Sequence, residues 1–477
     1  MADAALSSRN SASFLLGQKL DSIPFSAYHI AIILVLGLVG FIDGYDLALT
    51  GSLLILAKGP LHITPEQIRW LTIAATMFVV VGGFISAAIS DHVSRKTIIQ
   101  IGVVGMTFFT LLIPFAQTAE QLIVVRLLTG IGLGFAITAP FPVAAELMPA
   151  QHRRTYGAIY EICLASAFAL LPLVAGLLVG NANGFRWIAL PGGLALFVVP
   201  VLVHLVIPQS PRWQLRHGRI QTAIDTVNQI IRRAGSRVPP LTLAALGPNL
   251  REAQALLPPF RNLFARGQFR WTAVGIVTAM CAGTGYYMCA ILLPKALIDQ
   301  GAAVTMSFGI TTIVFLSTIP GKAFNAFLME RIGRRWTIAY ALSGGFPGLA
   351  LMATAHLCGD LAGIMTTAGA VLLGFTSLSA FPATRVYLSE QFPTALRGRG
   401  NVFGEAFGRI FAGVLAPFLI EPYTGSAFAF FGTIVVVLLF GAFIPLLFGK
   451  ETVGQLEHVT EGHGAAPLGE PVPAIAG

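Results

Sequence analysis

Apolar segments long enough to cross a lipid bilayer recur along nearly the whole of this 477-residue chain, and they constrain its fold more than any other feature. A helix needs about 20 predominantly apolar residues to cross roughly 30 Å of hydrocarbon. We expect twelve such helices, at residues 26–57, 68–90, 97–116, 120–145, 155–180, 187–207, 269–294, 304–328, 336–356, 361–388, 400–420 and 425–448. The unbroken apolar runs exclude a β-barrel, whose strands alternate apolar and polar residues.

Composition agrees with a membrane protein. Of the residues, 55% are hydrophobic and 11% are charged. The 51 glycines and 28 prolines would disrupt soluble helices, but membrane helices tolerate both and use small residues for close packing. The polar segment 1–22 lacks the short apolar core of a cleavable signal peptide, so the first span is expected to remain. The sequence therefore predicts an all-α membrane protein.

Basic side chains, which give the chain a net charge of +9, are concentrated in alternate loops. The loops after the even-numbered spans contain Arg95, Lys96, Arg153, Arg154, Arg212, Arg216, Arg219, Arg232, Arg233, Arg237, Arg331, Arg334, Arg335, Arg397 and Arg399. By the positive-inside rule, both termini and the long central loop are expected in the cytoplasm, with the protein in an inner or plasma membrane. No basic face interleaved with exposed aromatic residues is visible, so no nucleic-acid partner is expected.

The chain divides into two halves that contain similar motifs in the same order. DHVSRK at 91–96 corresponds to ERIGRR at 330–335, and ELMPAQHR at 146–153 corresponds to EQFPTALR at 390–397. We expect a cytoplasmic tail at 1–25, six-helix bundles at 26–207 and 269–448, a cytoplasmic linker at 208–268 and a second cytoplasmic tail at 449–477. Duplicated bundles around a midplane site are typical of secondary transporters.

Motifs of soluble enzymes are missing. Gly130, Gly132 and Gly134 lie within an apolar helix with no preceding strand, so they are interpreted as helix-packing positions rather than a dinucleotide loop. No Walker lysine or catalytic triad appears, so neither an enzyme nor ATP-driven transport is expected. The four cysteines have no paired spacing, so no metal or cofactor is expected.

Seven motifs, in order along the chain, resemble the major facilitator superfamily, specifically its sugar-porter-like branch. They are GYD at 44–46, RLLTGIGLG at 126–134, E-x-x-P-x-x-x-R at 146–153, PQSPRW at 208–213, GRR at 333–335, SEQFPTALRG at 389–398 and ETVGQLE at 451–457. Ala87, His92 and Ser94 depart from the family pattern, which usually has Gly, a basic residue and Gly there. The resemblance implies twelve transmembrane helices in two pseudo-symmetric six-helix bundles, the major facilitator fold.

Two acids in the first span raise the question of function. A charge inside a span costs several kcal/mol unless it is paired or hydrated, and it usually faces a cavity. Asp43 and Asp46 are expected at the same depth as Arg126 of the fourth span. The resemblance implies that Asp46 pairs with Arg126 and is the proton site, whereas Asp43 is similar to an acid of aromatic-acid:proton symporters. The alternative is a static ion pair that holds the two spans together.

The residues that hold hexoses in sugar porters are missing. The corresponding positions are Ile162, Ala279 with Met280, and Arg385. Two buried arginines, Arg385 and Arg409, are candidates to bind a substrate carboxylate through their planar guanidinium groups. Alternatively, Arg409 pairs with Glu405 in its own helix, and Arg385 extends to the cytoplasmic edge.

Further polar residues are candidates for gating or for the cavity wall. Tyr286 and Tyr287 match paired tyrosines of the family's seventh span and are expected either to line the cavity or to pack. Lys322 and Asn325 also lie within a span. Charges expected to gate or to stabilise the bundles are Asp91, Arg95, Glu146, Arg153, Glu161, Glu330, Arg334, Glu390, Arg397 and Glu405.

The favoured hypothesis is a monomeric secondary transporter that couples protons to the symport of a small organic anion, a carboxylate such as an aromatic acid, by alternating access. One alternative is a proton-coupled or facilitative carrier of a neutral sugar-like or polyol-like metabolite. Another is a non-transporting sensor on the same scaffold, although such sensors usually have a long signalling tail and the tail here is short. The substrate's identity and the direction of transport do not follow from the sequence.

Overall fold

The computed structural model describes residues 12–90, 92–149, 152–246, 260–265, 267–392 and 396–451. Over these residues the chain is helical and contains no strand. Twelve helices within them are long and apolar enough to cross a membrane, which confirms the prediction. They span Ala27–Leu56, Pro65–Ile89, Arg95–Phe115, Ala119–Ala144, Ile159–Leu177, Gly184–Val206, Phe269–Asp299, Val304–Arg331, Arg334–Leu357, Gly359–Glu390, Phe403–Tyr423 and Ala427–Phe448.

The spans of the first bundle are built from eight helices. These are α3 (Ala27–Leu56), α4 (Pro65–Ile89), α5 (Arg95–Leu112), α6 (Ala119–Thr138), α7 (Pro140–Leu147), α8 (Arg153–Leu177), α9 (Gly184–Leu194) and α10 (Val199–Val206). Two of the spans are divided into two helices, and in each the second helix, α7 or α10, has a proline in its first turn. In the first turn of a helix the missing N–H of proline costs nothing.

The second bundle contains α13 (Phe269–Tyr287), α14 (Leu293–Asp299), α15 (Val304–Arg331), α16 (Arg334–Thr354), α17 (Ala362–Phe375), α18 (Phe381–Glu390), α19 (Arg397–Ile410), α20 (Ala416–Ile420) and α21 (Ala427–Phe448). Two π-helical segments, η7 (Met288–Leu292) and η11 (Phe411–Leu415), interrupt its first and fifth spans. Such π-segments are frequent at functional sites.

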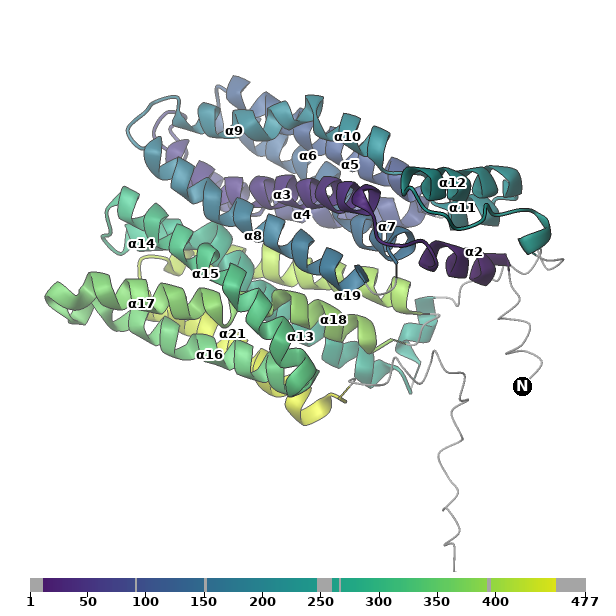
Figure 1. Ribbon diagram of the computed structural model, residues 1–477. Coiled ribbons are helices and arrows are strands. Elements are labelled where there is room, and N and C mark those ends of the chain that lie inside the picture. The colour runs from purple at the N-terminus through teal and green to yellow at the C-terminus, as the bar shows by residue number, and fades with distance from the viewer. Residues whose placement is uncertain are drawn as a thin grey trace, which may run out of the picture.

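The two bundles lie side by side with their helices roughly parallel to one long direction (Figure 1). Within the first, α3 packs on α8 and α6 packs on both α4 and α5; within the second, α16 packs on α17 and α21. Contacts between the bundles run chiefly from α8 to α15 and from α4 to α19. The predicted arrangement of two six-helix bundles is therefore confirmed.

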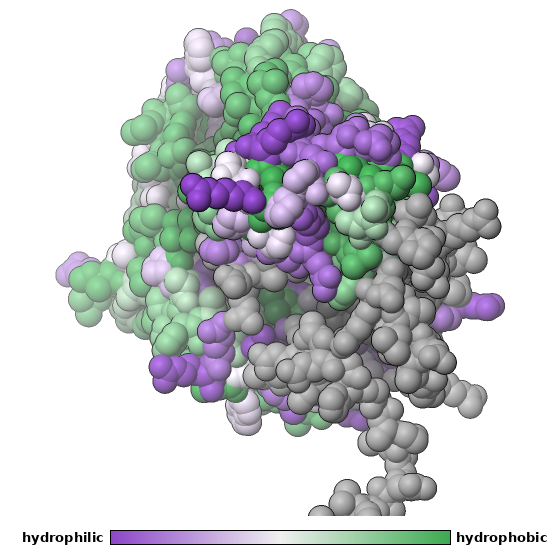
Figure 2. Space-filling model, turned by 45° about the vertical axis from the view of Figure 1, so that its right-hand side comes forward, coloured by the Kyte–Doolittle hydropathy of each residue, from purple (hydrophilic) through white to green (hydrophobic). Residues whose placement is uncertain are grey.

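One end of the molecule is marked by the short helices α2 (Ala12–Asp21), α11 (Pro211–Arg216) and α12 (Ile220–Arg233), and we call it the linker end. The opposite end is called the far end. Hydrophilic atoms gather at the linker end, while hydrophobic atoms cover much of the visible flank (Figure 2). Large apolar side chains such as Leu177 and Val436 are exposed on the molecule's surface. Apolar surface of this extent fits contact with lipid rather than water.

Glycines allow the helices of the first bundle to touch backbone to backbone. A Cβ added to Gly130 would overlap the carbonyl oxygen of Ala75 in α4, and one added to Gly134 would overlap that of Val79. Gly132 lies equally close to the backbone of Met106 in α5. Close approach of this kind is a main source of helix association in lipid. The interpretation of these three glycines as packing positions is confirmed.

We expect Gly134→Val to destabilise the protein strongly, because the new side chain would force α6 away from α4; overpacking costs about 1–3 kcal/mol or more. The matched control is Gly309→Val in α15, where an added Cβ meets no described atom within 4 Å. Thermal unfolding of the detergent-solubilised protein measures both variants. Equal shifts in the unfolding temperature would contradict the packing role of Gly134.

Candidate functional site

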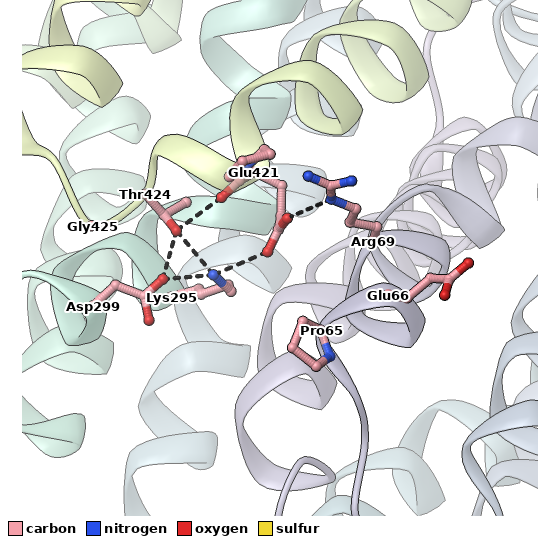
Figure 3. A pocket seen from close by; sticks show the side chains of 9 residues that line it. Pro65, Glu66, Arg69, Lys295, Asp299, Glu421, Thr424 and Gly425 are labelled. Atoms are coloured by element: carbon pink, nitrogen blue, oxygen red, sulfur yellow. Dashed lines mark hydrogen bonds and ion pairs between the residues drawn. The ribbon is translucent and has the colours of Figure 1, made fainter.

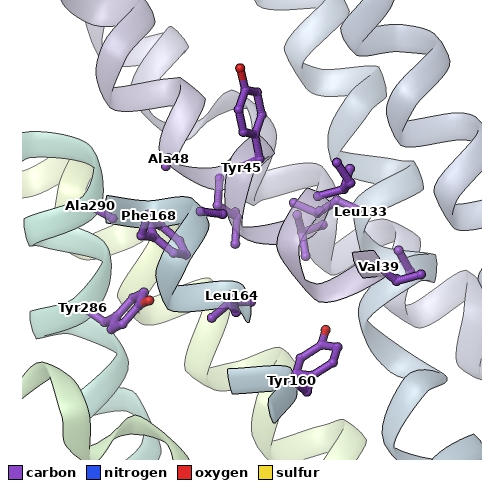
Figure 4. Packing of buried hydrophobic residues seen from close by; sticks show 14 of the residues in the cluster. Val39, Tyr45, Ala48, Leu133, Tyr160, Leu164, Phe168, Tyr286 and Ala290 are labelled. Atoms are coloured by element: carbon purple, nitrogen blue, oxygen red, sulfur yellow. The ribbon is translucent and has the colours of Figure 1, made fainter. Parts of the chain in front are cut away.

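The two bundles meet at mid-depth through a layer of aromatic side chains. Phe168 of α8 lies between α3 and the helix that carries Tyr286 (Figure 4). Its ring meets the ring of Tyr286 edge to face at 5.1 Å and stacks on Phe315 of α15 at 5.1 Å. Tyr286 in turn stacks on Phe381 of α18 at 5.3 Å. Charged groups next to this layer have few polar neighbours other than one another, so their pairing decides the chemistry of the site.

Asp46 of α3 and Arg126 of α6 form a fully buried ion pair. Arg126 Nη1 lies 2.8 Å from Asp46 Oδ1, and its Nη2 donates to the backbone oxygen of Asp46 at 2.8 Å and to Thr50 Oγ1 at 2.7 Å. Thr110 of α5 donates to the same Oδ1 at 2.8 Å. Three helices of one bundle thus hold the carboxylate. Oδ2 of Asp46 is buried and has no hydrogen-bond partner among the described residues.

Asp43, one turn earlier, faces a different neighbourhood. Tyr160 of α8 donates to its Oδ2 over a long 3.4 Å, and its Oδ1 has no hydrogen-bond partner in the part of the chain that the structure describes. Asp43 also lies within electrostatic range of Arg385 and Arg409 in the second bundle. The two acids therefore differ, because Asp46 is ion-paired inside its own bundle whereas Asp43 lies within electrostatic range of two cations of the other bundle.

Arg385 of α18 points inward rather than to the edge of the bundle. Its Nη1 lies 2.9 Å from Glu161 Oε1, and its Nε lies 2.8 Å from Glu405 Oε1. The guanidinium carbon is 4.5 Å from the ring centre of Phe381 and 5.9 Å from that of Phe141 in the first bundle. The alternative in which Arg385 extends to the cytoplasmic edge does not match this geometry.

Arg409 of α19 is 7% exposed and has a weak ionic partner. Its Nη1 donates to the hydroxyl of Tyr287 at 2.7 Å, while its Nη2 lies 3.8 Å from Glu405 Oε2. Because Glu405 is closer to Arg385, it only partly neutralises Arg409. The predicted intrahelical pair exists, but it is loose, and a second anion would find an available guanidinium.

A narrow cleft of about 10 Å³, with room for no more than a water molecule in this conformation, joins these side chains. It is lined from α13, α18 and α19 by Ala279, Gly283, Tyr287, Phe381, Thr384, Arg385, Gly404, Glu405, Gly408 and Arg409. Ala279, which the resemblance places at a hexose-holding position of sugar porters, forms part of this wall, and glycines supply much of the rest. The cleft therefore offers two cations, one hydroxyl and one aromatic face, but few groups that would bind a ring of hydroxyls.

The other predicted positions separate into those that reach the interface and those that do not. Tyr287 lines the cleft, whereas Tyr286 is packed among aromatic rings. Ile162 is 36% exposed on the outside of α8, so the residue of this helix that faces the interior is its neighbour Glu161, with 4% exposure. Asn325 donates to Ser379 at 2.7 Å inside the second bundle.

Equivalent acid–arginine pairs lie in the two bundles at the linker end. Arg95 Nη1 is 3.0 Å from Glu146, which also accepts from Ser210 Oγ and the backbone N–H of Arg212. Arg334 Nε is 3.3 Å from Glu390. These pairs join motifs that the sequence singled out separately.

Four further charges were predicted to gate the protein or to stabilise the bundles. Asp91 and the side chains of Arg153 and Arg397 lie outside the described residues, and Glu330 is exposed near the end of α15. Their predicted roles stay predictions.

At the far end, a charge network that sequence reasoning missed connects the bundles. Glu421 lies between Arg69 of α4 and Lys295 of α14 (Figure 3), at 3.2 Å from each. Lys295 also contacts Asp299 at 2.6 Å, beside an open pocket of about 550 Å³. The sequence offered one signal for this network: an acid at the end of a span, and basic residues at two other positions of the far end.

Close contacts at two glycines lie near this network. A Cβ on Gly51 of α3 would meet the carbonyl oxygen of Ala290 in η7 at 2.6 Å, and one on Gly413 in η11 would overlap Thr76 of α4. Each π-segment of the second bundle therefore contacts the first bundle at a point where one of the two residues must be a glycine. The bundles are therefore closely packed at Gly51 and Gly413, beside the open pocket.

The chain matches one protein family along most of its length. The family model is described as Major Facilitator Superfamily and matches residues 36–403 and, in a second match, 277–474. Curated relatives include a niacin transporter, NiaP, from Acinetobacter baylyi, with 27% identity over 92% of this chain and 97% of the relative. An arabinose-proton symporter from Bacillus subtilis is 24% identical over 89% of this chain and 92% of the relative.

Among solved structures, the chain superposes on the xylose transporter XylE from E. coli in a partially occluded inward-open conformation. The TM-score is 0.71 with 17% identity, covering 90% of this chain and 99% of that one. At this identity the match shows the fold alone.

Proposed function

This chain belongs to the Major Facilitator Superfamily, and from that premise we propose that it moves a small organic anion across a membrane together with a proton. It is a secondary transporter and not an enzyme. Its cargo and its driving ion are the proposed parts. The observation that carries the proposal is Arg409, a buried guanidinium in a mid-depth cleft with only a loose carboxylate partner at 3.8 Å.

The chemistry of the cleft favours an anion over a sugar. A buried guanidinium presents a planar pair of donors that matches a carboxylate. Arg409 with Tyr287 offers such donors, and Phe381 offers a flat face beside them. Niacin, named for one relative, carries a single carboxylate on an aromatic ring, so it is the first cargo to test.

Proton coupling is supported by the two acids of α3. Asp46 keeps one carboxylate oxygen without a described hydrogen-bond partner, although its other oxygen is bound to Arg126 and Thr110. Protonation of Asp46 would weaken its attraction to Arg126 and loosen α3 from α6. Asp43, which lies within electrostatic range of two cations of the second bundle, would feel the arrival of an anion most directly.

The proposed cycle follows from these positions. A cavity open at the far end protonates Asp46 and admits the anion to Arg409. The bundles then rock about the mid-depth layer, the far end closes through Glu421, and the linker end opens. The proton and the anion leave there. We place the linker end, with both termini, on the cytoplasmic side because of its arginine-rich loops.

A neutral sugar-like cargo is the second candidate, because the arabinose-proton symporter is also a relative. The cleft gives this candidate less support, since Ala279 and Arg385 occupy positions where sugar porters hold hydroxyls. A non-transporting sensor on the same scaffold would tolerate the loss of Asp46, so the experiments below also test that reading.

Orientation is the first prediction. In a chain whose other native cysteines are replaced, the exposed Cys358 at the far end should react with a membrane-impermeant thiol reagent added to intact cells. A single cysteine placed by Arg216→Cys at the linker end should react only after the cells are opened. Labelling of Arg216→Cys in intact cells would reverse the orientation.

Asp46→Asn is expected to abolish uphill, pH-gradient-driven uptake while leaving niacin exchange partly intact, because the amide keeps the side chain's shape but cannot ionise. Asp43→Asn should also impair uptake, to a smaller extent. Proteoliposomes loaded with and without a pH gradient separate the two activities. Gradient-driven uptake by Asp46→Asn at the wild-type level would remove Asp46 as the proton site.

Arg409→Gln is expected to weaken niacin binding about ten- to hundredfold, since a charge-assisted contact contributes roughly 1.5–3 kcal/mol. Lysine should restore only part of the affinity, because a point charge lacks the planar pair of donors. The matched ligand is nicotinamide, the uncharged amide of the same ring, whose binding should change little.

A control separates recognition from structure. If Arg409 only balances Glu405, the double change Glu405→Gln with Arg409→Gln should recover the binding that the single change lost. Equal losses for acid and amide would also indicate a structural role, and a wild type that prefers nicotinamide would argue against the anion.

A further inference from the structure

Glu161 is an acid of the first bundle whose charged neighbours belong to the second. Its Oε1 lies 2.9 Å from Arg385 Nη1, and its Oε2 lies 3.0 Å from Lys322 Nζ. Lys322 also donates to the backbone oxygen of Glu161 at 2.9 Å. The side chains of Glu161 and Lys322 are each 5% exposed. A carboxylate of α8 therefore neutralises two cations across the bundle interface.

The two cations differ in their surroundings. Lys322 lies in α15, which packs closely along α8, so this ion pair belongs to the main contact between the bundles. Arg385 lies in α18 and lines the cleft beside Arg409 and Tyr287. Between Glu161 on one side and Glu405 on the other, the guanidinium of Arg385 is held by two carboxylates of the protein itself.

A ligand anion can reach Arg385 only in exchange for one of these carboxylates. Glu161 contacts Arg385 through one oxygen, whereas Glu405 contacts it through both, at 2.8 and 3.4 Å. After its release from Arg385, Glu161 keeps its contacts with Lys322, so it does not become an unpaired buried charge. Glu405 has a looser second cation partner, Arg409, at 3.8 Å, and its side chain is 28% exposed.

We propose that Glu161 occupies the place of the substrate carboxylate at Arg385 when the cleft is empty and is displaced by it when the anion binds. This inference rests on the proposed function, and it names the regulation of the same site. Arg409 makes the first contact with the anion, and Arg385 becomes a partner only by exchange. Each exchange breaks an ion pair between the bundles, so binding weakens their connection and favours their movement.

The test compares ligand affinities of purified, full-length protein by calorimetry, with niacin and nicotinamide as probes. In Glu161→Gln, niacin no longer competes with a charged side chain, so its affinity should rise about tenfold, the effect of losing one charge-assisted contact of about 1.5 kcal/mol. Nicotinamide binding should not tighten. In an Arg385→Gln background, the effect of Glu161→Gln on niacin should vanish, because the two residues act as one unit.

Glu161→Gln leaves Lys322 without its partner and is at risk of misfolding. The double change Glu161→Gln with Lys322→Met removes both charges and frees Arg385 equally, so it should also bind niacin more tightly. Glu421→Gln is the control, because it breaks the ion pair with the half-exposed Arg69 that joins the bundles at the far end, without touching Arg385. It should not reproduce the selective gain for the acid.

The outcomes separate the two proposals. If the wild type binds niacin and neither Glu161 variant binds it more tightly, the exchange at Arg385 is overturned. The proposed anion transport is not affected by that result. Equal gains for niacin and nicotinamide, or an equal gain in Glu421→Gln, also overturn it, because they indicate a shift in conformation rather than removal of a competitor. A wild type that binds neither niacin nor other small carboxylates overturns the proposed function and this inference together.

Discussion

The cost of burying a charge in a poorly hydrated layer is the constraint on which the rest of this structure depends. An unpaired ion there destabilises the protein by several kcal/mol, so each buried carboxylate must meet a cation or accept hydrogen bonds. Asp46 obliges α3, α5 and α6 to converge, because Arg126 and Thr110 must both reach it. Glu161 in the same way ties α8 to α15 and α18. Pairing of charges thus positions helices whose apolar surfaces alone could slide past one another.

The two kinds of ion pair suit two different tasks. The Asp46–Arg126 pair joins helices of one bundle, so changing its charge alters that bundle internally. The pairs of Glu161 and of Arg69 with Glu421 join one bundle to the other, at mid-depth and at the far end. Rocking of the bundles must break or remake contacts of the second kind. The glycine contacts at Gly51 and Gly413 show how closely the two bundles pack at these positions near the far end.

The comparison with a solved sugar transporter shows that the two chains share a fold at low sequence identity. The chain superposes on XylE over most of its length, yet its cleft contains arginines, glycines and an aromatic face. The helices provide two bundles and a mid-depth cleft, and the side chains decide what enters. Arg385 and Arg409 are therefore more informative about function than the fold is.

The sequence by itself determined the helices, the duplicated bundles and which charged residues lie within the spans. It could do so because the length of an apolar run and the order of motifs are local properties of the chain. It also indicated the Asp46–Arg126 pair, since both residues belong to recognised motifs at matching depth. It did not show that Glu161 meets Lys322 and Arg385, that Ile162 faces outward, or that Glu421 joins Arg69 to Lys295. These contacts depend on the rotation of each helix about its axis and on residues far apart in the chain. Only the tertiary structure decided them, because a shift of one residue along a helix turns a side chain by about 100° and exchanges an interior position for one that faces lipid.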